Sequence, residues 1–255
     1  MRIVAIAVNT MREAIRNKIL YSILLFACLI TGISAVFGAA SIGNPLKFIK
    51  DFSLFSISLF GVVTTVVLGV TLLSKELGKR TIYNILSKPV ARWQFLVGKY
   101  LGLLATLGIM MGLLAAALLT MLRLWEGHFD WQVVAVIGTM MLELSILLAA
   151  ALFFSSIVVT PSLAGFFTVA TFIAGRSARM LSYFESAQQP PALRQMAGTL
   201  YAILPHLDRL YIADRVVSGL PVPGTFYLHA TLYTAAYAGV LLLLSVAIFR
   251  RREFY

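Results

Sequence analysis

The chain has 255 residues, of which 60% are hydrophobic and only 12% are charged, and its formal net charge is +11. Soluble domains carry about 25% charged and about 45–50% apolar residues, and a globular protein of this length has no interior large enough for the excess apolar surface. The composition excludes an ordinary soluble protein and indicates an integral membrane protein. The basic residues gather between apolar runs, as they do at the cytoplasmic faces of membrane proteins, so we expect no nucleic-acid partner.

The first 18 residues predict an amphipathic helix that lies in the membrane interface. Apolar residues recur there at spacings of three and four, with arginines and a lysine on the other side, which is typical of interfacial helices. An ordinary surface helix remains open. The apolar run that follows, from Ile19 to Ala40, has 22 residues. A signal-peptide core has about 7–15, so we expect a retained first span.

Six apolar stretches are long enough to cross a hydrocarbon core of about 30 Å as helices. The 45 residues from Trp131 to Gly175 contain one charge, Glu143, and their length allows two crossings. Polar residues and Pro161 place the turn between these crossings near 155–162. We therefore expect spans at about 19–40, 52–73, 99–122, 131–154, 158–175 and 226–249.

The segment 176–225 is charged and rich in proline, and we expect an extramembrane or partly re-entrant segment on the outer side. Within it, residues 207–217 predict an amphipathic helix with balanced charge. Three roles remain open for this helix: covering the outer exit, docking a periplasmic partner, or forming a passive surface.

The distribution of basic residues predicts the orientation. With six spans, both termini and the 74–99 loop share one side, which carries 13 Lys and Arg residues, whereas the two short connections on the other side carry three. Positive charge marks the cytoplasmic side. We expect both termini in the cytoplasm and a multi-pass protein of the cytoplasmic (inner) membrane.

Several catalytic and metal-binding motifs are absent from the sequence. Gly98-Lys99 is followed by Tyr100 and lacks the upstream glycine of a phosphate-binding loop. Neither H-E-x-x-H nor G-x-S-x-G occurs, and Cys28 is the single cysteine. We expect no enzymatic activity, no metal site and no cofactor bound by this chain.

The loop 75–102 carries the most informative pattern. Apolar residues and a proline recur on one side of 79–89 with basic residues facing elsewhere, which indicates a short helix along the membrane surface. Anionic lipid and an acidic protein groove are both open as its contact. Pro89 permits a break, and a second helical piece starting near Val90 is expected to lead into the third span.

This loop resembles the signature loop of type-2 ABC exporter permeases. Members carry an acidic residue after the second span, a Gly/Lys/Arg-Thr step, a leucine-rich turn, a proline, an arginine and a Gly-Lys entering the third span. The stretch 200–219 is also similar to the family's segment before the last span. The matching positions in the loop are Glu76, Arg80-Thr81, Ile85-Leu86, Pro89, Arg92 and Gly98-Lys99.

The resemblance implies one all-α permease domain over residues 1–255, with a cytoplasmic coupling helix that enters a cleft of a separate ATPase. Two permeases, identical or different, pair with two ATPases, which bind the ATP and drive export. Glu76 and Arg80 have the spacing of an ion pair, and a solvated pair is equally open. The implied coupling residues are Glu76, Lys79, Arg80, Thr81, Ile85, Leu86, Pro89 and Arg92.

Two features inside the spans have alternative readings. Glu143 lies near the middle of a span, where an acidic side chain costs a few kcal/mol unless it is paired, protonated or hydrated. It either lines a translocation path or is hydrogen-bonded inside the bundle. Gly98-x-x-x-Gly102 and Gly108-x-x-x-Gly112 favour close helix packing, within one subunit or at a dimer seam.

The alternative function for the chain, in place of an exporter permease, is a secondary transporter or channel subunit.

Overall fold

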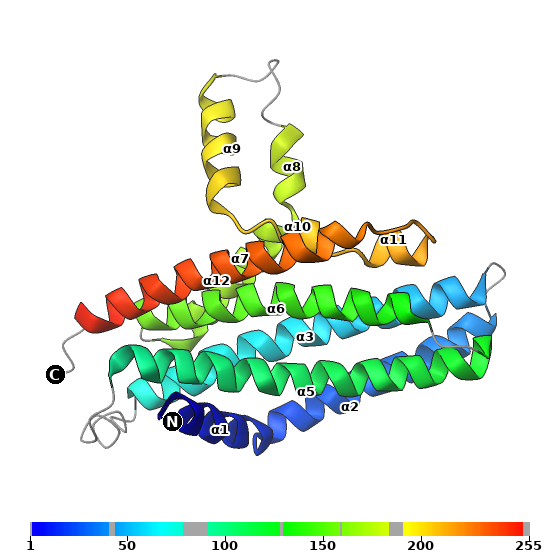
Figure 1. Cartoon of the computed structure of the whole chain (residues 1–255), viewed down its shortest axis with the longest axis horizontal. Helices are drawn as coiled ribbons and strands as arrows, with labels where there is room; N and C mark the ends of the chain where they lie inside the picture. The colour runs from blue at the N-terminus through cyan, green and yellow to red at the C-terminus, as the bar shows by residue number, and fades with distance from the viewer. Residues whose placement is uncertain are drawn as a thin grey trace.

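The computed structural model describes residues 2–40, 44–78, 91–127, 130–158, 160–183 and 191–251, and the regular elements in these ranges are helices. Figure 1 shows the long helices running alongside one another, with most of the shorter ones on one side and the N-terminal helix on the other. The helices are α1 (Arg2–Ile15), α2 (Lys18–Ala40), α3 (Pro45–Gly78), α5 (Arg92–Glu126), α6 (Trp131–Ile157), α7 (Pro161–Arg176), α8 (Ala178–Tyr183), α9 (Pro191–Ile203), α10 (Leu207–Leu210), α11 (Ala213–Val217) and α12 (Gly224–Arg251).

Among the described residues, five helices are long and apolar enough to cross a membrane: α2, α3, α5, α6 and α12. Helix α6 is the centre of the bundle, because 72% of its most apolar stretch is buried, compared with 22% in α2 and in α12. The outer helices expose large apolar side chains such as Phe26 and Leu243, as expected of surfaces solvated by lipid.

Helix α7 takes the place of the fifth expected span. The chain breaks where the sequence predicts, since α6 ends at Ile157 and Pro161 is the first residue of α7. However, α7 has only 16 residues, and it is about 24 Å long at 1.5 Å per residue, which is shorter than a hydrocarbon core of about 30 Å. The count of six spans therefore stays a prediction.

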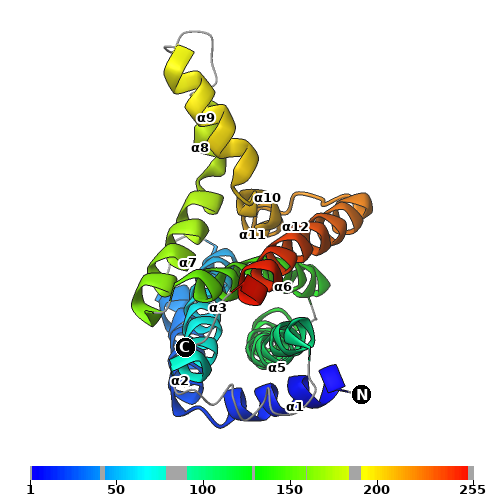
Figure 2. The ribbon, with the colours of Figure 1, turned by 90° about the vertical axis from the view of Figure 1, so that its left-hand side faces the viewer.

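The N-terminal helix crosses one end of the bundle. In Figure 2, α1 passes beneath α5, which is seen nearly end-on. A Cβ at Gly98 would lie 2.8 Å from the Cβ of Ile6, and one at Gly102 would press on the carbonyl oxygen of Ala7. These two glycines therefore allow close packing of helices within one subunit, the first of the two alternatives for this motif.

The beginning of α1, the end of α3, the start of α5 and the end of α12 lie at the same end of the bundle (Figure 1). The basic-residue pattern likewise predicts these four helix ends on one side of the membrane. We call this end of the bundle the junction end below.

The segment after α7 departs from expectation in one respect. Helices α8 and α9 form a hairpin that stands away from the bundle in both views (Figures 1 and 2). The single amphipathic helix predicted over 207–217 is wrong, because two short helices, α10 and α11, occupy this stretch. The chain is extended at Tyr211 between them, and this break turns the Tyr211 ring onto Arg176 while Leu210 and Ile212 remain buried.

Candidate functional site

A buried ion pair joins α6 to α7. The Glu143 side chain, in the middle of α6, is only 1% exposed. Arg176, the last residue of α7, donates from Nε to Oε1 of Glu143 at 2.7 Å and from Nη2 to Oε2 at 2.8 Å. This bidentate geometry is the strongest form of contact between an arginine and a carboxylate.

Three further side chains complete the environment of Arg176. Its Nη2 also donates to Oγ of Ser58 in α3 at 2.9 Å. The Tyr211 ring covers the guanidinium, with its centroid 3.8 Å from Cζ, and the Phe172 ring lies at 5.3 Å. Burial raises the pKa of the Tyr211 phenol, although the charge of Arg176 opposes this rise. The tyrosine therefore stays neutral and presents its ring face to the cation.

The cluster joins helices from distant parts of the chain. Glu143, Arg176 and Ser58 belong to α6, α7 and α3, and Tyr211 lies between α10 and α11. Removing charges from water is costly, and the pair offsets this cost through its good geometry and additional hydrogen bonds. The closed ion pair can hold these helices together, and opening of the pair would allow them to separate.

The sequence indicated Glu143 but not its partners. In the structure Glu143 is hydrogen-bonded inside the bundle, and its role in a translocation path stays a prediction. Arg176, Ser58 and Tyr211 were missed because they lie far along the chain from Glu143. One signal was available, since an acidic residue within a span normally pairs with a cation. Arg176 is the first residue after the apolar stretch 131–175 that contains Glu143.

A second set of contacts ties helix ends together at the junction end. Arg92, the first residue of α5, donates from Nη1 to the carbonyl oxygen of Phe249 in α12 at 2.7 Å. Lys99 is 1% exposed, and its Nζ donates to the carbonyl oxygen of Leu72 in α3 at 3.2 Å. The rings of Phe95 and Phe249 stack 6.2 Å apart beside these bonds.

The predicted coupling residues are only partly visible. Glu76 lies in the last turns of α3, and Arg92 begins α5, two residues after the expected start near Val90. The predicted surface helix and the Glu76–Arg80 pair include residues outside the described ranges. The six remaining residues, which also lie outside these ranges, are Lys79, Arg80, Thr81, Ile85, Leu86 and Pro89.

No group of three or more metal-ligating side chains occurs in the part of the chain that the structure describes. A comparison with curated proteins found no match. Residues 4–254 match the family described as "ABC-2 family transporter protein". This match covers nearly the whole chain and agrees with the several apolar helices of the bundle. The chain therefore belongs to the ABC-2 transporter family, as a multi-pass membrane permease.

Proposed function

We propose that this chain is the permease subunit of an ABC exporter, in which two permeases pair with two copies of a separate ATPase subunit. The observation that carries the proposal is the family match over residues 4–254. The chain has no phosphate-binding loop of its own. ATP hydrolysis therefore belongs to the partner, and this chain supplies the route across the cytoplasmic membrane.

The proposed orientation places the junction end in the cytoplasm. Its support is the excess of basic residues in the connections assigned to that side. The ATPase then meets residues 79–92 between α3 and α5, and the α8–α9 hairpin belongs to the outward-facing segment.

The junction contacts supply a route for force. Because Arg92 holds the start of α5 to the end of α12 and Lys99 holds α5 to the end of α3, a push on residues 79–92 moves three helix ends together. Helices are stiff along their axes, so this displacement reaches the middle of the bundle. The proposed coupling residues thus act on α3, α5 and α12 as one body.

We further propose that Glu143 borders the translocation path when the bundle opens. Its partner Arg176 ends α7, the short helix beside the central α6. Intramembrane ionisable residues commonly mark the paths of transported molecules. In this proposal the closed bundle pairs Glu143 with Arg176, and separation of α6 from α7 exposes both to the substrate.

Affinity purification tests the pairing with an ATPase. The tagged full-length chain is expressed in its native host, and co-purifying proteins are identified by mass spectrometry and assayed for ATP hydrolysis. We expect a protein with a phosphate-binding loop, at a yield lowered at least about tenfold, or about 1.4 kcal/mol, by Arg80→Ala, Leu86→Ala or Arg92→Ala. The matched control is Arg194→Ala, which removes an exposed arginine from α9.

Two results would contradict the proposal. In the first, the wild-type chain brings down no ATPase. In the second, the ATPase co-purifies equally well with all three junction variants, which would place the coupling surface elsewhere.

A further inference from the structure

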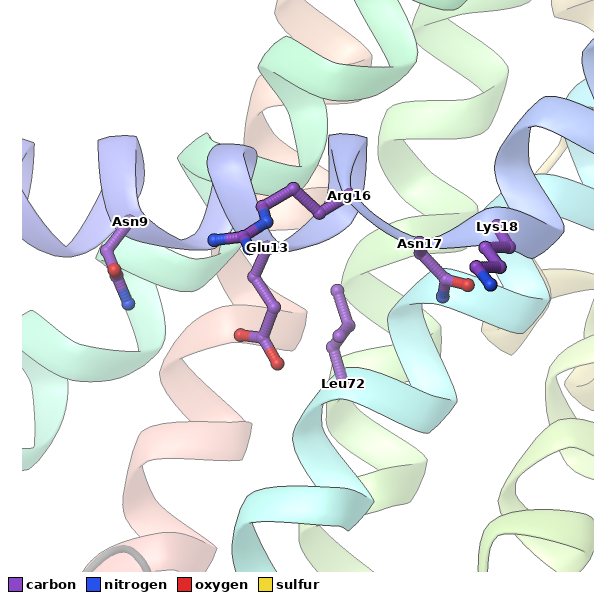
Figure 3. Close-up of a pocket in the computed structure, with 6 residues that line it drawn as sticks. All are labelled: Asn9, Glu13, Arg16, Asn17, Lys18 and Leu72. Atoms are coloured by element: carbon purple, nitrogen blue, oxygen red, sulfur yellow. The ribbon is translucent and has the colours of Figure 1, made fainter.

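A polar cavity of about 630 Å³ opens between the second half of α1, the start of α2 and the end of α3. Figure 3 shows the Glu13 carboxylate and the Asn9 amide extending from α1 into this space, with Leu72 of α3 facing α1 from the other side. The complete lining in the described chain is Asn9, Glu13, Arg16, Asn17, Lys18 and Leu72.

The cavity lies at the depth of lipid headgroups. The first apolar helix begins at Lys18, and the apolar run of α3 gives way after Leu73 to Ser74, Lys75 and Glu76. Both helices thus leave the hydrocarbon at the cavity wall. Helix α1 crosses this end of the bundle (Figure 2), and its amphipathic sequence suits the interface plane. A ligand in the cavity is therefore within reach of the bilayer surface.

The lining offers charges of both signs. Arg16 and Lys18 are exposed, and within the described chain neither side-chain cation has a hydrogen-bond or ion-pair partner. Asn17 accepts a hydrogen bond from the N–H of Ile19 through Oδ1, which leaves its amide N–H groups available as donors. Glu13 adds a carboxylate, whose two oxygens can accept from several donors at once.

An apolar groove continues from the cavity along α1. It has a volume of about 630 Å³ and is lined by Val4, Ala5 and Val8, together with Asn9 and Arg12. Asn9 borders both spaces, so they adjoin. Val4 is 64% exposed, which places an apolar side chain beside a polar cavity at the membrane surface. A molecule with a charged head and an apolar tail fits this combination.

We propose that the cavity binds a phospholipid whose headgroup carries both a phosphodiester and an amine, as an ethanolamine headgroup does. The phosphodiester meets Arg16 and Lys18, the ammonium meets the Glu13 carboxylate, and an acyl chain follows Val4 and Val8. An ethanolamine headgroup gains a charge-assisted contact with the Glu13 carboxylate that a glycerol headgroup lacks. The lipid would brace α1 against α3 beside the coupling segment.

Native mass spectrometry of the full-length, delipidated protein tests the proposal. The probes are dioleoyl phosphatidylethanolamine, dioleoyl phosphatidylglycerol and soluble glycerophosphoethanolamine. We expect the ethanolamine lipid to bind most tightly and to lose about tenfold in affinity in Arg16→Gln/Lys18→Gln, because two charge-assisted contacts are lost. The control Arg194→Gln/Arg215→Gln removes equal charge from exposed positions far along the chain and should bind like wild type.

A second variant separates the two parts of the headgroup. Glu13→Gln should abolish the preference for ethanolamine over glycerol while retaining binding of the phosphodiester. The proposal is overturned if Arg16→Gln/Lys18→Gln binds normally or if wild type does not distinguish the two lipids. It is equally overturned if glycerophosphoethanolamine competes as well as the intact lipid, which would indicate a site for soluble anions. Circular dichroism of each variant checks that the helices remain folded.

Discussion

Replacing Glu143 with glutamine should destabilise the protein severely, although the change is nearly isosteric. In the wild type, the Glu143 carboxylate receives two charge-assisted hydrogen bonds from Arg176, at 2.7 and 2.8 Å. A glutamine amide has one oxygen to accept with, and its NH₂ group would face the second guanidinium nitrogen. The substitution also leaves the charge of Arg176 unpaired, with only 25% of the side chain exposed to offset the loss.

The expected cost is about 3–5 kcal/mol. Hydrogen bonds to charged groups contribute about 1.5–3 kcal/mol each, and Glu143→Gln removes one and reverses the polarity of the other. Arg176 keeps its hydrogen bond to Ser58 and its contact with the Tyr211 ring, which limits the loss. The free-energy cost therefore stays within the range found when one member of a buried ion pair is removed. Replacing both members, as in Glu143→Leu/Arg176→Met, should cost less than either single change.

Thermal unfolding in detergent, followed by circular dichroism, measures this effect in wild type, Glu143→Gln, Arg176→Met, Glu143→Gln/Arg176→Met and Glu143→Leu/Arg176→Met. A coupling energy of at least about 1 kcal/mol between the two positions is expected for groups in direct contact. Asp51→Asn is the matched control, because it makes the same carboxylate-to-amide change in an exposed side chain. A Glu143→Gln protein within about 0.5 kcal/mol of wild type, the usual range of surface substitutions, would refute the reasoning.

Two further predictions concern other parts of the fold. Gly102→Ala should lower stability by about 1–3 kcal/mol and increase thiol labelling of a cysteine placed in α1, because the added Cβ presses on Ala7. The control Gly112→Ala should be neutral, because its Cβ meets nothing within 4 Å. Equal stability and labelling of the two variants would contradict this prediction. Burial opposes ionisation of Asp130, but the hydrogen bond and charge of Lys50 at 2.8 Å outweigh it and lower the pKa of that carboxyl. The stability from this pair is therefore present above about pH 4, the unfolded pKa, and is lost as pH falls through the folded pKa. Thermal unfolding should show Asp130→Asn less stable than wild type at pH 7, with the difference in stability shrinking towards pH 3. A difference that stays constant with pH would refute the assignment.

The sequence predicted the positions of the apolar spans better than the ends of the helices. Hydropathy marks the part of a helix that lies in hydrocarbon, whereas the helix continues wherever its backbone bonds are satisfied. The second expected span began at 52, yet α3 begins at Pro45, and the third began at 99, yet α5 begins at Arg92. In both cases the additional turns carry charged residues such as Lys50 and Arg92, which the interface accommodates without any apolar signal.

The partners of Glu143 lay beyond local reasoning for a different reason. Periodicity reports which face of a helix is apolar, but it does not report which helices become neighbours. Arg176 is separated from Glu143 by the second half of α6, the following turn and the rest of α7, and Tyr211 lies at the break between α10 and α11. The charge balance inside the membrane required a cation, and the geometry that selects Arg176 is a property of the tertiary fold.

Helix α3 connects the two sets of polar contacts. Its Leu72 carbonyl receives the bond from Lys99 at the junction end, and its Ser58 hydroxyl receives the bond from Arg176. The two residues are about 21 Å apart along the helix axis at 1.5 Å per residue, and a continuous helix between them resists compression. An axial displacement of α3 at the junction must therefore stretch the bond between Ser58 and Arg176 unless α7 moves with it. The same displacement that an ATPase would impose on residues 79–92 would thus load the buried ion pair, and the strength of that pair would set how far α7 follows α3.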